Sequence, residues 1–273
     1  MQSVIFKSTI VAQVVHSINI EASTKAKCPF GYGGNSTETL VQTVDEVTYL
    51  EEMFSDSLEF SENLTEADYD SIATAIFANF DGLSSELGAQ SNKRGSMVAC
   101  LLRTAGHDFM DYRVESENEG GSDGCINFDD EDNGGLQQCL TEFGIPALFD
   151  EHKDKVSLAD FIVIIAEAAM ARAHSSYADV NAVDSLFNKF RNGFKWGRRS
   201  VADCAWNTGR MPSPEHGCHG KDGKDGLEQI FIDNIYKDVD AAWTMVAAIS
   251  GAHTVGGATQ TTSGYNGYWS DVE

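Results

Sequence analysis

The sequence predicts a mainly α-helical protein with long structured loops. Apolar residues recur at helical spacing in several segments, whereas the alternating Val, Ile and Thr runs that are typical of strands are scarce. Only four of the 273 residues are prolines, which permits long helices, and 25 glycines suit the loops between them. Hydrophobic residues make up 42% of the chain, enough for a folded core.

The predicted helices follow one another along the chain. The clearest covers 157–172, where Ser157 can cap the first turn and an apolar face follows. Two helices are expected before it, at 66–79 and 91–112, with a short one at 136–143. Helical patterns also cover 227–235 and 241–251. The glycine-rich, acidic segment 115–135 and the segment 192–219 are expected to be loops.

Charge excludes some classes of partner. Lys and Arg number 19 against 42 Asp and Glu, which gives a net charge of −23. Repulsion of this size argues against nucleic acid or an anionic membrane surface as a partner, and it suits a protein that binds cations. No apolar run is long enough to span a membrane.

The six cysteines suggest disulfides and an oxidising compartment. They show no zinc-like spacing, and six cysteines allow fifteen pairings, among which the spacing does not choose. Sequons begin at Asn35 and Asn63. Residues 1–34 are expected to be a leader or an N-terminal extension, and secretion is the expected localisation, with an intracellular or organellar location as the alternative.

Two segments carry residues suited to redox chemistry. Arg103 and His107 are four residues apart in the helix predicted at 91–112, so they share one face. There an imidazole can move a proton while a guanidinium stabilises developing negative charge; the alternative is a solvated surface pair. The second segment, 246–256, is an apolar helix that ends in small residues and His253. This histidine could ligate a haem iron, or merely interact with the helix dipole.

Together these segments resemble the distal and proximal haem helices of the plant, fungal and bacterial haem peroxidase superfamily. The first resembles the motif Arg-x-x-aromatic-His, and Ile249-Ser250-Gly251-Ala252-His253-Thr254-Val255-Gly256 resembles the proximal Leu-Ser-Gly-Ala-His-Thr-Ile-Gly. Further segments match in order over residues 66 to 269. They are Gly121-Ser122-Asp123-Gly124, Asn133-Gly134-Gly135-Leu136, Ser157-Leu158-Ala159-Asp160, Gly197-Arg198 and Gly209-Arg210-Met211-Pro212.

The resemblance implies a helical fold with haem b held between a distal and a proximal helix. The peroxidase domain would cover 35–273, with a distal half at 66–150 and a proximal part at 151–273. Since the family continues well beyond the position of Glu273, we expect the proximal part to be incomplete.

The resemblance also implies roles for individual residues. His107 would be the acid–base catalyst of peroxide cleavage, Arg103 would stabilise the departing oxygen, and Asn133 would orient His107. His253 would be the iron ligand. Ser263-Gly264-Tyr265-Asn266-Gly267-Tyr268-Trp269 resembles the segment that places a redox-active Trp beside the haem in ascorbate and cytochrome c peroxidases, so Trp269 would take that role.

Calcium is implied by a further match. Asp108, Asp123 and the Gly121 carbonyl match calcium ligands of secreted family members, and Thr254 matches a ligand of a second cation site. Oxygen ligands of this kind suit a hard cation, although a solvated acidic loop is the alternative.

Some positions depart from the family pattern. Gly106 stands where the family has Phe or Trp over the haem, so the resemblance implies that the site would be open to a larger substrate or to solvent. Cys125 replaces a serine of the calcium loop, and sulfur is a poor calcium ligand. Thr262 stands in place of an ascorbate-binding arginine, so ascorbate is not favoured as the reductant.

The expected activity is therefore peroxidase chemistry. Hydrogen peroxide would be the oxidant, and an unknown small molecule or protein would be the one-electron donor. Two alternatives remain open at this point: a catalytically weakened, peroxidase-like structural or binding protein, or a fragment of an active peroxidase.

Overall fold

A computed structural model describes residues 60, 61, 64–86, 92–113, 120–177, 180–202, 204, 211, 227–237 and 239–255. The described residues are mainly helical, which confirms the predicted fold class, and contain no strand beyond an isolated bridge between Ser85 and Asn92. None of the described helices combines the length and the apolar character that a membrane span requires.

The N-terminal half of the described chain supplies two long helices. α3 (Glu66–Gly82) begins in a capping box, in which Thr65 Oγ1 accepts from the Asp68 amide and the Asp68 carboxylate accepts from the Thr65 amide. α4 (Lys93–Met110) begins at Asn92, whose side chain accepts from the Gly95 amide at 2.9 Å. These caps satisfy amides that a helix cannot bond internally, and so they fix where each helix starts.

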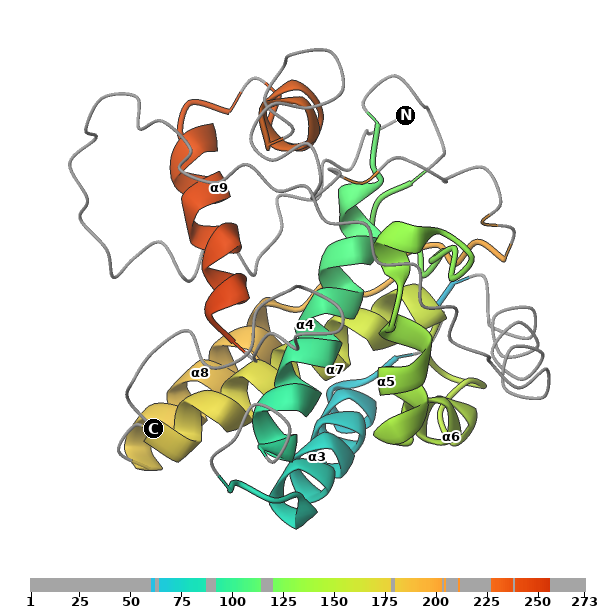
Figure 1. Cartoon of the computed structure of the whole chain (residues 1–273). Helices are drawn as coiled ribbons and strands as arrows, with labels where there is room; N and C mark the ends of the chain where they lie inside the picture. Colours follow the sequence, from blue (N-terminus) through green and yellow to red (C-terminus); the bar gives the residue numbers. More distant parts are fainter. Residues whose placement is uncertain are drawn as a thin grey trace.

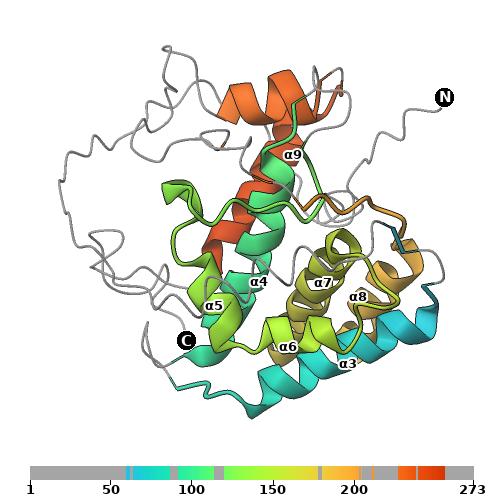
Figure 2. The ribbon, with the colours of Figure 1, turned by 90° about the vertical axis from the view of Figure 1, so that its right-hand side faces the viewer.

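Helix α7 (Leu158–Tyr177) is the centre of the main core. As predicted, Ser157 caps it: the Ser157 hydroxyl accepts from the Asp160 amide at 3.3 Å. Its residues are buried almost continuously from Leu158 to Ala169, because α3, α4 and α8 (Val180–Gly193) all pack against it. Figure 1 and Figure 2 show this arrangement. A helix that is apolar on nearly every side is stable only when neighbours surround it in this way.

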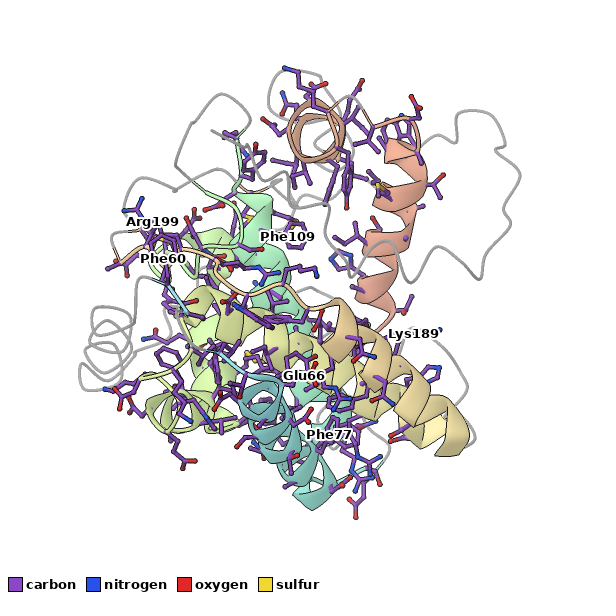
Figure 3. All side chains as sticks on the ribbon, turned by 180° about the vertical axis from the view of Figure 1, so that it is seen from behind. Phe60, Glu66, Phe77, Phe109, Lys189 and Arg199 are labelled. Carbon is purple, nitrogen blue, oxygen red and sulfur yellow. A yellow bond between two sulfur atoms is a disulfide. The ribbon has the colours of Figure 1, made fainter. Side chains whose placement is uncertain are left out.

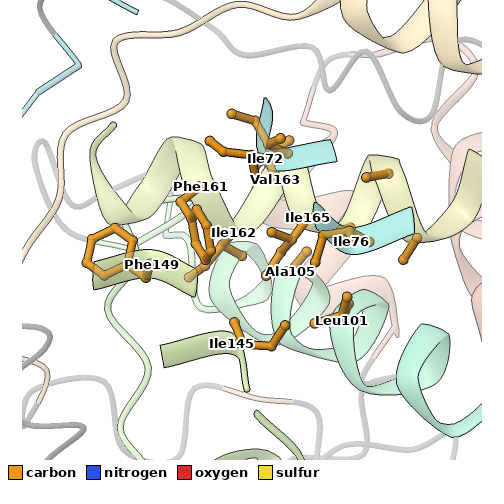
Figure 4. Packing of buried hydrophobic residues seen from close by; sticks show 14 of the residues in the cluster. Ile72, Ile76, Leu101, Ala105, Ile145, Phe149, Phe161, Ile162, Val163 and Ile165 are labelled. Carbon is orange, nitrogen blue, oxygen red and sulfur yellow. The ribbon is translucent and has the colours of Figure 1, made fainter. Parts of the chain in front are cut away.

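The core links helices that lie far apart in the sequence. Figure 4 shows Ile72 and Ile76 of α3 and Leu101 of α4 meeting Ile162 and Ile165 of α7. Two short helices close one side of this core: α5 (Leu136–Glu142), which was predicted, and α6 (Ile145–Asp150), which was not. Helix α8 was also not predicted. The described part of 115–135 is a loop with one 3₁₀ turn, η2 (Glu131–Asn133), as expected.

Two disulfides join these elements. Cys100 of α4 pairs with Cys139 of α5, and Cys125 in the acidic loop pairs with Cys204. The prediction of disulfides is therefore confirmed for four of the six cysteines; Cys28 and Cys218 lie outside the described residues, as do both sequon asparagines. Since Cys139 lies just beyond Asn133, the first disulfide ties α4 to the segment that interacts with His107.

The C-terminal elements form a second, smaller cluster at one end of α4. They are the π-helical segment η5 (Glu228–Ile235), α9 (Ala242–Ser250) and the 3₁₀ turn η6 (Gly251–Thr254). Ile230, Phe231 and Val246 are buried in this cluster, and Phe109 and Met110 of α4 pack against it. Phe109, labelled in Figure 3, lies at the end of α4 that meets these elements. The last turn of α4 therefore carries the contact between the two clusters.

A buried acid lies within the main core. The Glu167 side chain of α7 is only 2% exposed, and the Tyr69 hydroxyl donates to its Oε2 at 2.8 Å. Burial raises the pKa of Glu167 to about 7, although the Tyr69 hydrogen bond and the charge of Arg198 oppose this effect. The carboxyl group is thus partly neutral near neutral pH.

Replacing Glu167 with Gln should stabilise the protein at about pH 8 and have little effect at about pH 4. The raised pKa means that the folded state binds more protons than the unfolded state between the ordinary value of 4.5 and about 7. Wild-type stability should therefore fall as pH rises through this window, by roughly 3 kcal/mol in total, and the neutral amide removes that loss. Urea unfolding of both proteins across this pH range measures the effect. Glu86→Gln, at an exposed acid, is the control. Parallel pH profiles for wild type and Glu167→Gln would contradict the prediction.

Candidate functional site

Arg103 and His107 face the same side of α4, one turn apart. The Arg103 Nε–H donates to His107 Nε2 at 3.3 Å. The structure therefore brings the two side chains together, as their four-residue spacing predicted. Arg103 is exposed and His107 is half-buried, so the pair lies where the helix meets solvent.

The segment immediately before α5 holds both side chains in place. Arg103 donates from Nη1 to the Gly134 carbonyl at 2.8 Å and from Nη2 to the Asp132 carbonyl at 3.0 Å. His107 Nδ1 lies 2.8 Å from Asn133 Oδ1. A planar guanidinium with fixed donor directions is oriented firmly by two such carbonyls.

The orientation of Asn133 decides which imidazole nitrogen carries the proton. The Asn133 amide donates from Nδ2 to the Asn127 carbonyl at 2.7 Å, so its oxygen faces His107. An oxygen acceptor requires a proton on His107 Nδ1, and the lone pair is then left on Nε2. The nitrogen next to Arg103 is thus the one that can accept a proton.

Electrostatics keep this imidazole neutral. Burial and then the positive charge of Arg103 lower the pKa of His107, to about 4 in total, while the Asn133 hydrogen bond acts in the opposite direction. At neutral pH the side chain is therefore uncharged. Such an imidazole is available as a general base over a wide pH range.

His253 reaches the same region from the C-terminal elements. It lies in η6, directly after α9, and its side chain is exposed. A protonated His253 lowers the pKa of His107, which places the two histidines within electrostatic range although 146 residues separate them in the sequence. Both η5 and η6 contact α4, and the neighbouring Val255 packs against the main core. We refer to Arg103, His107, Asn133 and His253 as the candidate site.

An acidic cluster lies on the buried side of α4, next to His107. Its members are Asp108, Asp111 and Asp123, which are 0%, 1% and 7% exposed. Asp108 is notable because neither of its carboxylate oxygens has a hydrogen-bond partner among the described residues. Burial, followed by the charges of Asp123 and Asp111, raises the pKa of Asp108 well above its usual value. Burial and Asp111 also raise the pKa of Asp123 to about 7.

The other two carboxylates of the cluster bond to the neighbouring loop. Asp111 Oδ1 accepts from the Gly121 amide at 2.7 Å, and Asp123 Oδ1 accepts from the Cys125 amide at 2.9 Å. The Gly121 carbonyl accepts from the Asp123 amide at 2.7 Å. Sequence reasoning missed Asp111; its position three residues after Asp108 on one helix face was the available signal. Within the described ranges, no three His, Cys, Asp or Glu side chains converge as a formed metal site.

The remaining residues singled out from the sequence are Thr254, Cys125, Trp269 and Thr262. Thr254 is exposed, and its hydroxyl donates to the Gly251 carbonyl at 2.7 Å. Cys125 is bonded to Cys204, so it offers no thiolate to the acidic loop. Trp269 and Thr262 lie outside the described residues.

Comparison with known proteins gives no assignment: no protein-family model matches the chain, and no curated protein matches it significantly. The functional argument consequently depends on the residues of the candidate site themselves.

Replacing Asn133 with Asp should raise the pKa of His107 by about one unit or more, because a carboxylate beside Nδ1 stabilises the imidazolium. NMR titration of the imidazole C–H signals measures the effect, with the wild-type midpoint expected at about 4. The exposed His174 serves as the internal control, and its midpoint should not move. An unshifted His107 midpoint would show that Asn133 does not hold this ring.

Proposed function

We propose that this protein is a haem-dependent peroxidase that reduces hydrogen peroxide and oxidises an organic or protein donor one electron at a time. The observation that carries the proposal is the joint geometry of Arg103, His107 and Asn133: a neutral imidazole with its lone pair on Nε2, next to a fixed guanidinium. The resemblance of the two histidine segments to those of haem peroxidases supports it.

The residues present suit a haem group. The exposed imidazole of His253 is available as an iron ligand, and small residues, Gly251 and Ala252, precede it. His107 lies within electrostatic range of this side chain, and Arg103 donates to His107. Bound haem would supply the iron that exchanges electrons with the peroxide and with the donor.

The chain's own residues would manage the proton and the charge. His107 Nε2 takes a proton from the peroxide, and the hydrogen bond from Nδ1 to Asn133 steadies the imidazolium that results. His107 then returns the proton to the departing oxygen, which leaves as water. Arg103 stabilises the negative charge that develops as the O–O bond breaks. In the structure His107 Nε2 accepts a hydrogen bond from Arg103 Nε–H at 3.3 Å, and a peroxide oxygen would have to replace this contact in order to be bound by both side chains.

Adding hemin to the purified protein should give a Soret band, and hydrogen peroxide should then change that spectrum rapidly. His107→Leu should slow the spectral change by about a hundredfold or more, the range expected for loss of a general acid–base group. Stopped-flow absorbance measures the rate, and His174→Leu, at an exposed histidine of α7, should leave it unchanged.

Three results would contradict parts of this proposal. Absence of a Soret band would refute the claim that the protein binds haem. An unchanged rate in His107→Leu would refute the acid–base role assigned to that residue. Hemin uptake without any response to peroxide would instead favour the peroxidase-like binding protein that the sequence left open.

We further propose that the acidic cluster binds calcium in the functional protein. Burying carboxylates together is costly unless a cation or protons neutralise them, and the Asp108 oxygens have no other partner among the described residues. Carboxylate and carbonyl oxygens are the ligands that calcium prefers. Asp111, at the C-terminal end of α4, would add a carboxylate to the ligand set, to which the disulfide-bonded Cys125 contributes none.

Calcium should raise the melting temperature more at about pH 7.5 than at about pH 5, because protons compete with the cation for the raised-pKa carboxyls Asp108 and Asp123. Asp108→Asn should remove most of this response. Glu167→Gln is the matched control, a buried acid in the separate Tyr69 contact that should keep the full response. Differential scanning calorimetry with and without chelator measures the shift. An equal calcium response in wild type and Asp108→Asn would refute the site.

A further inference from the structure

The segment 185–202 differs in charge from the rest of this acidic chain. It holds five of the 19 basic residues and no acidic residue. Two of the five, both arginines, form ion pairs with aspartates of other segments. Lys195 and Arg199, in the loop that follows α8, have exposed side chains. That loop therefore presents positive charge on a protein whose net charge is −23.

Aromatic side chains are exposed at the same loop. Trp196 lies between the two cations in the sequence and is 49% exposed. Phe60 is 42% exposed, whereas the large apolar side chains of the main core are buried. A flat ring beside a positive charge can hold a ligand that combines an apolar face with an anionic group, and aromatic and arginine side chains are enriched at binding surfaces.

Phe60 lies beside this loop although the two are far apart in the sequence. The hydroxyl of the next residue, Ser61, accepts from the Ser157 amide at 2.9 Å, and the Ser157 hydroxyl donates to the Arg198 carbonyl at 3.1 Å. Figure 3 shows Phe60 and Arg199 next to each other. We refer to four side chains as the aromatic–cationic patch: Phe60, Lys195, Trp196 and Arg199.

The loop that carries most of this patch is held in a fixed shape. Asp160, which is fully buried, accepts from the Gly197 amide at 2.7 Å and from Arg198 Nη1 at 2.8 Å. Gly197 has a φ of 98°, in the left-handed region that favours glycine. The Ser200 hydroxyl accepts from the Ala159 amide at 3.1 Å. A loop anchored at these points loses little conformational entropy when it binds a ligand.

The size and chemistry of the patch favour a carbohydrate over a protein. A stable protein interface takes about 20 to 30 residues a side, many more than these four. A uronate oligosaccharide has sugar rings with an apolar C–H face, which fits an aromatic ring, and carboxylates, which pair with Lys and Arg. Salt screens charges beyond about 8 Å, so a ligand of a few sugars responds to the local cations more than to the net charge.

We propose that the aromatic–cationic patch binds a uronate oligosaccharide, with sugar rings stacked on Trp196 and Phe60 and carboxylates paired with Lys195 and Arg199. The patch shares no residue with the candidate site or the acidic cluster. Binding there needs neither haem nor calcium, so this inference stands or fails separately from the proposed function.

Isothermal titration calorimetry of the purified chain with tetragalacturonate tests the proposal. A chelator is present throughout, so that calcium cannot bridge the uronate to the acidic cluster. Wild type should bind with a Kd of about 1 mM or tighter. The fully methyl-esterified tetramer, which keeps the sugar rings and lacks the charges, should bind roughly tenfold more weakly, because it cannot pair with the cations.

Variants separate stacking from charge. Trp196→Ala should weaken binding of tetragalacturonate by roughly tenfold or more, and Trp196→Phe, which keeps a flat ring, should retain most of the affinity. Arg199→Gln should weaken binding by about twofold to fivefold. Trp243→Ala is the matched control, because Trp243 of α9 is also exposed, at 55%, and lies outside the patch. It should bind as wild type does.

Several results would overturn the proposal. They are no binding of tetragalacturonate by wild type, wild-type affinity in both Trp196→Ala and Arg199→Gln, and an equal loss in Trp243→Ala and Trp196→Ala. Tighter binding of a short single-stranded oligothymidylate than of tetragalacturonate would assign the patch to nucleic acid instead, since bases also stack on Trp beside cations. Absence of a Soret band with hemin has no bearing on these measurements.

Discussion

The hydrogen bond between His107 and Asn133 is the constraint on which the candidate site depends. It decides the tautomer of the imidazole and therefore which nitrogen points toward Arg103. Without an acceptor at Nδ1 the ring could present either nitrogen. The amide of Asn133 is itself fixed, because its nitrogen is committed to the Asn127 carbonyl. The loop that carries Asn133 thus sets the protonation pattern of His107, which lies 26 residues earlier in the sequence.

The scaffold keeps that loop against α4 by two independent means. Leu136 and Leu140, on the helix that follows the loop, are buried in the main core. The Cys100–Cys139 disulfide joins the same helix to α4 one turn before Arg103. Apolar burial and a covalent link therefore act on the same pair of elements, and the polar contacts between Arg103, His107 and the loop form within that frame.

Sequence patterns predicted the parts of this structure that depend on local physics. The α7 helix was predicted because Ser157 can cap an apolar helical face, and α5 was predicted as a short helix at 136–143. Helix α8 was missed although Leu186, Phe187 and Phe190 recur at helical spacing, so the signal was present in the sequence; Phe187 contacts the distant Tyr69. Likewise, the pair Arg103 and His107 was visible from its spacing, as the spacing of Asp108 and Asp111 would have been, whereas the contact of Asp111 with the Gly121 amide forms only in three dimensions.

The contact between the two hydrophobic clusters has a consequence for the proposed function. His253 is positioned by the C-terminal elements, and Phe109 and Met110 of α4 pack against these elements. The face of α4 beyond those residues, which carries His107 and Gly106, is left half-buried and without a side chain at the glycine. A flat apolar group held by His253 would cover that face and displace little existing packing. Arg103 and His253 are exposed in the structure. A group bound between them would bury both side chains and so strengthen their electrostatic effect on His107.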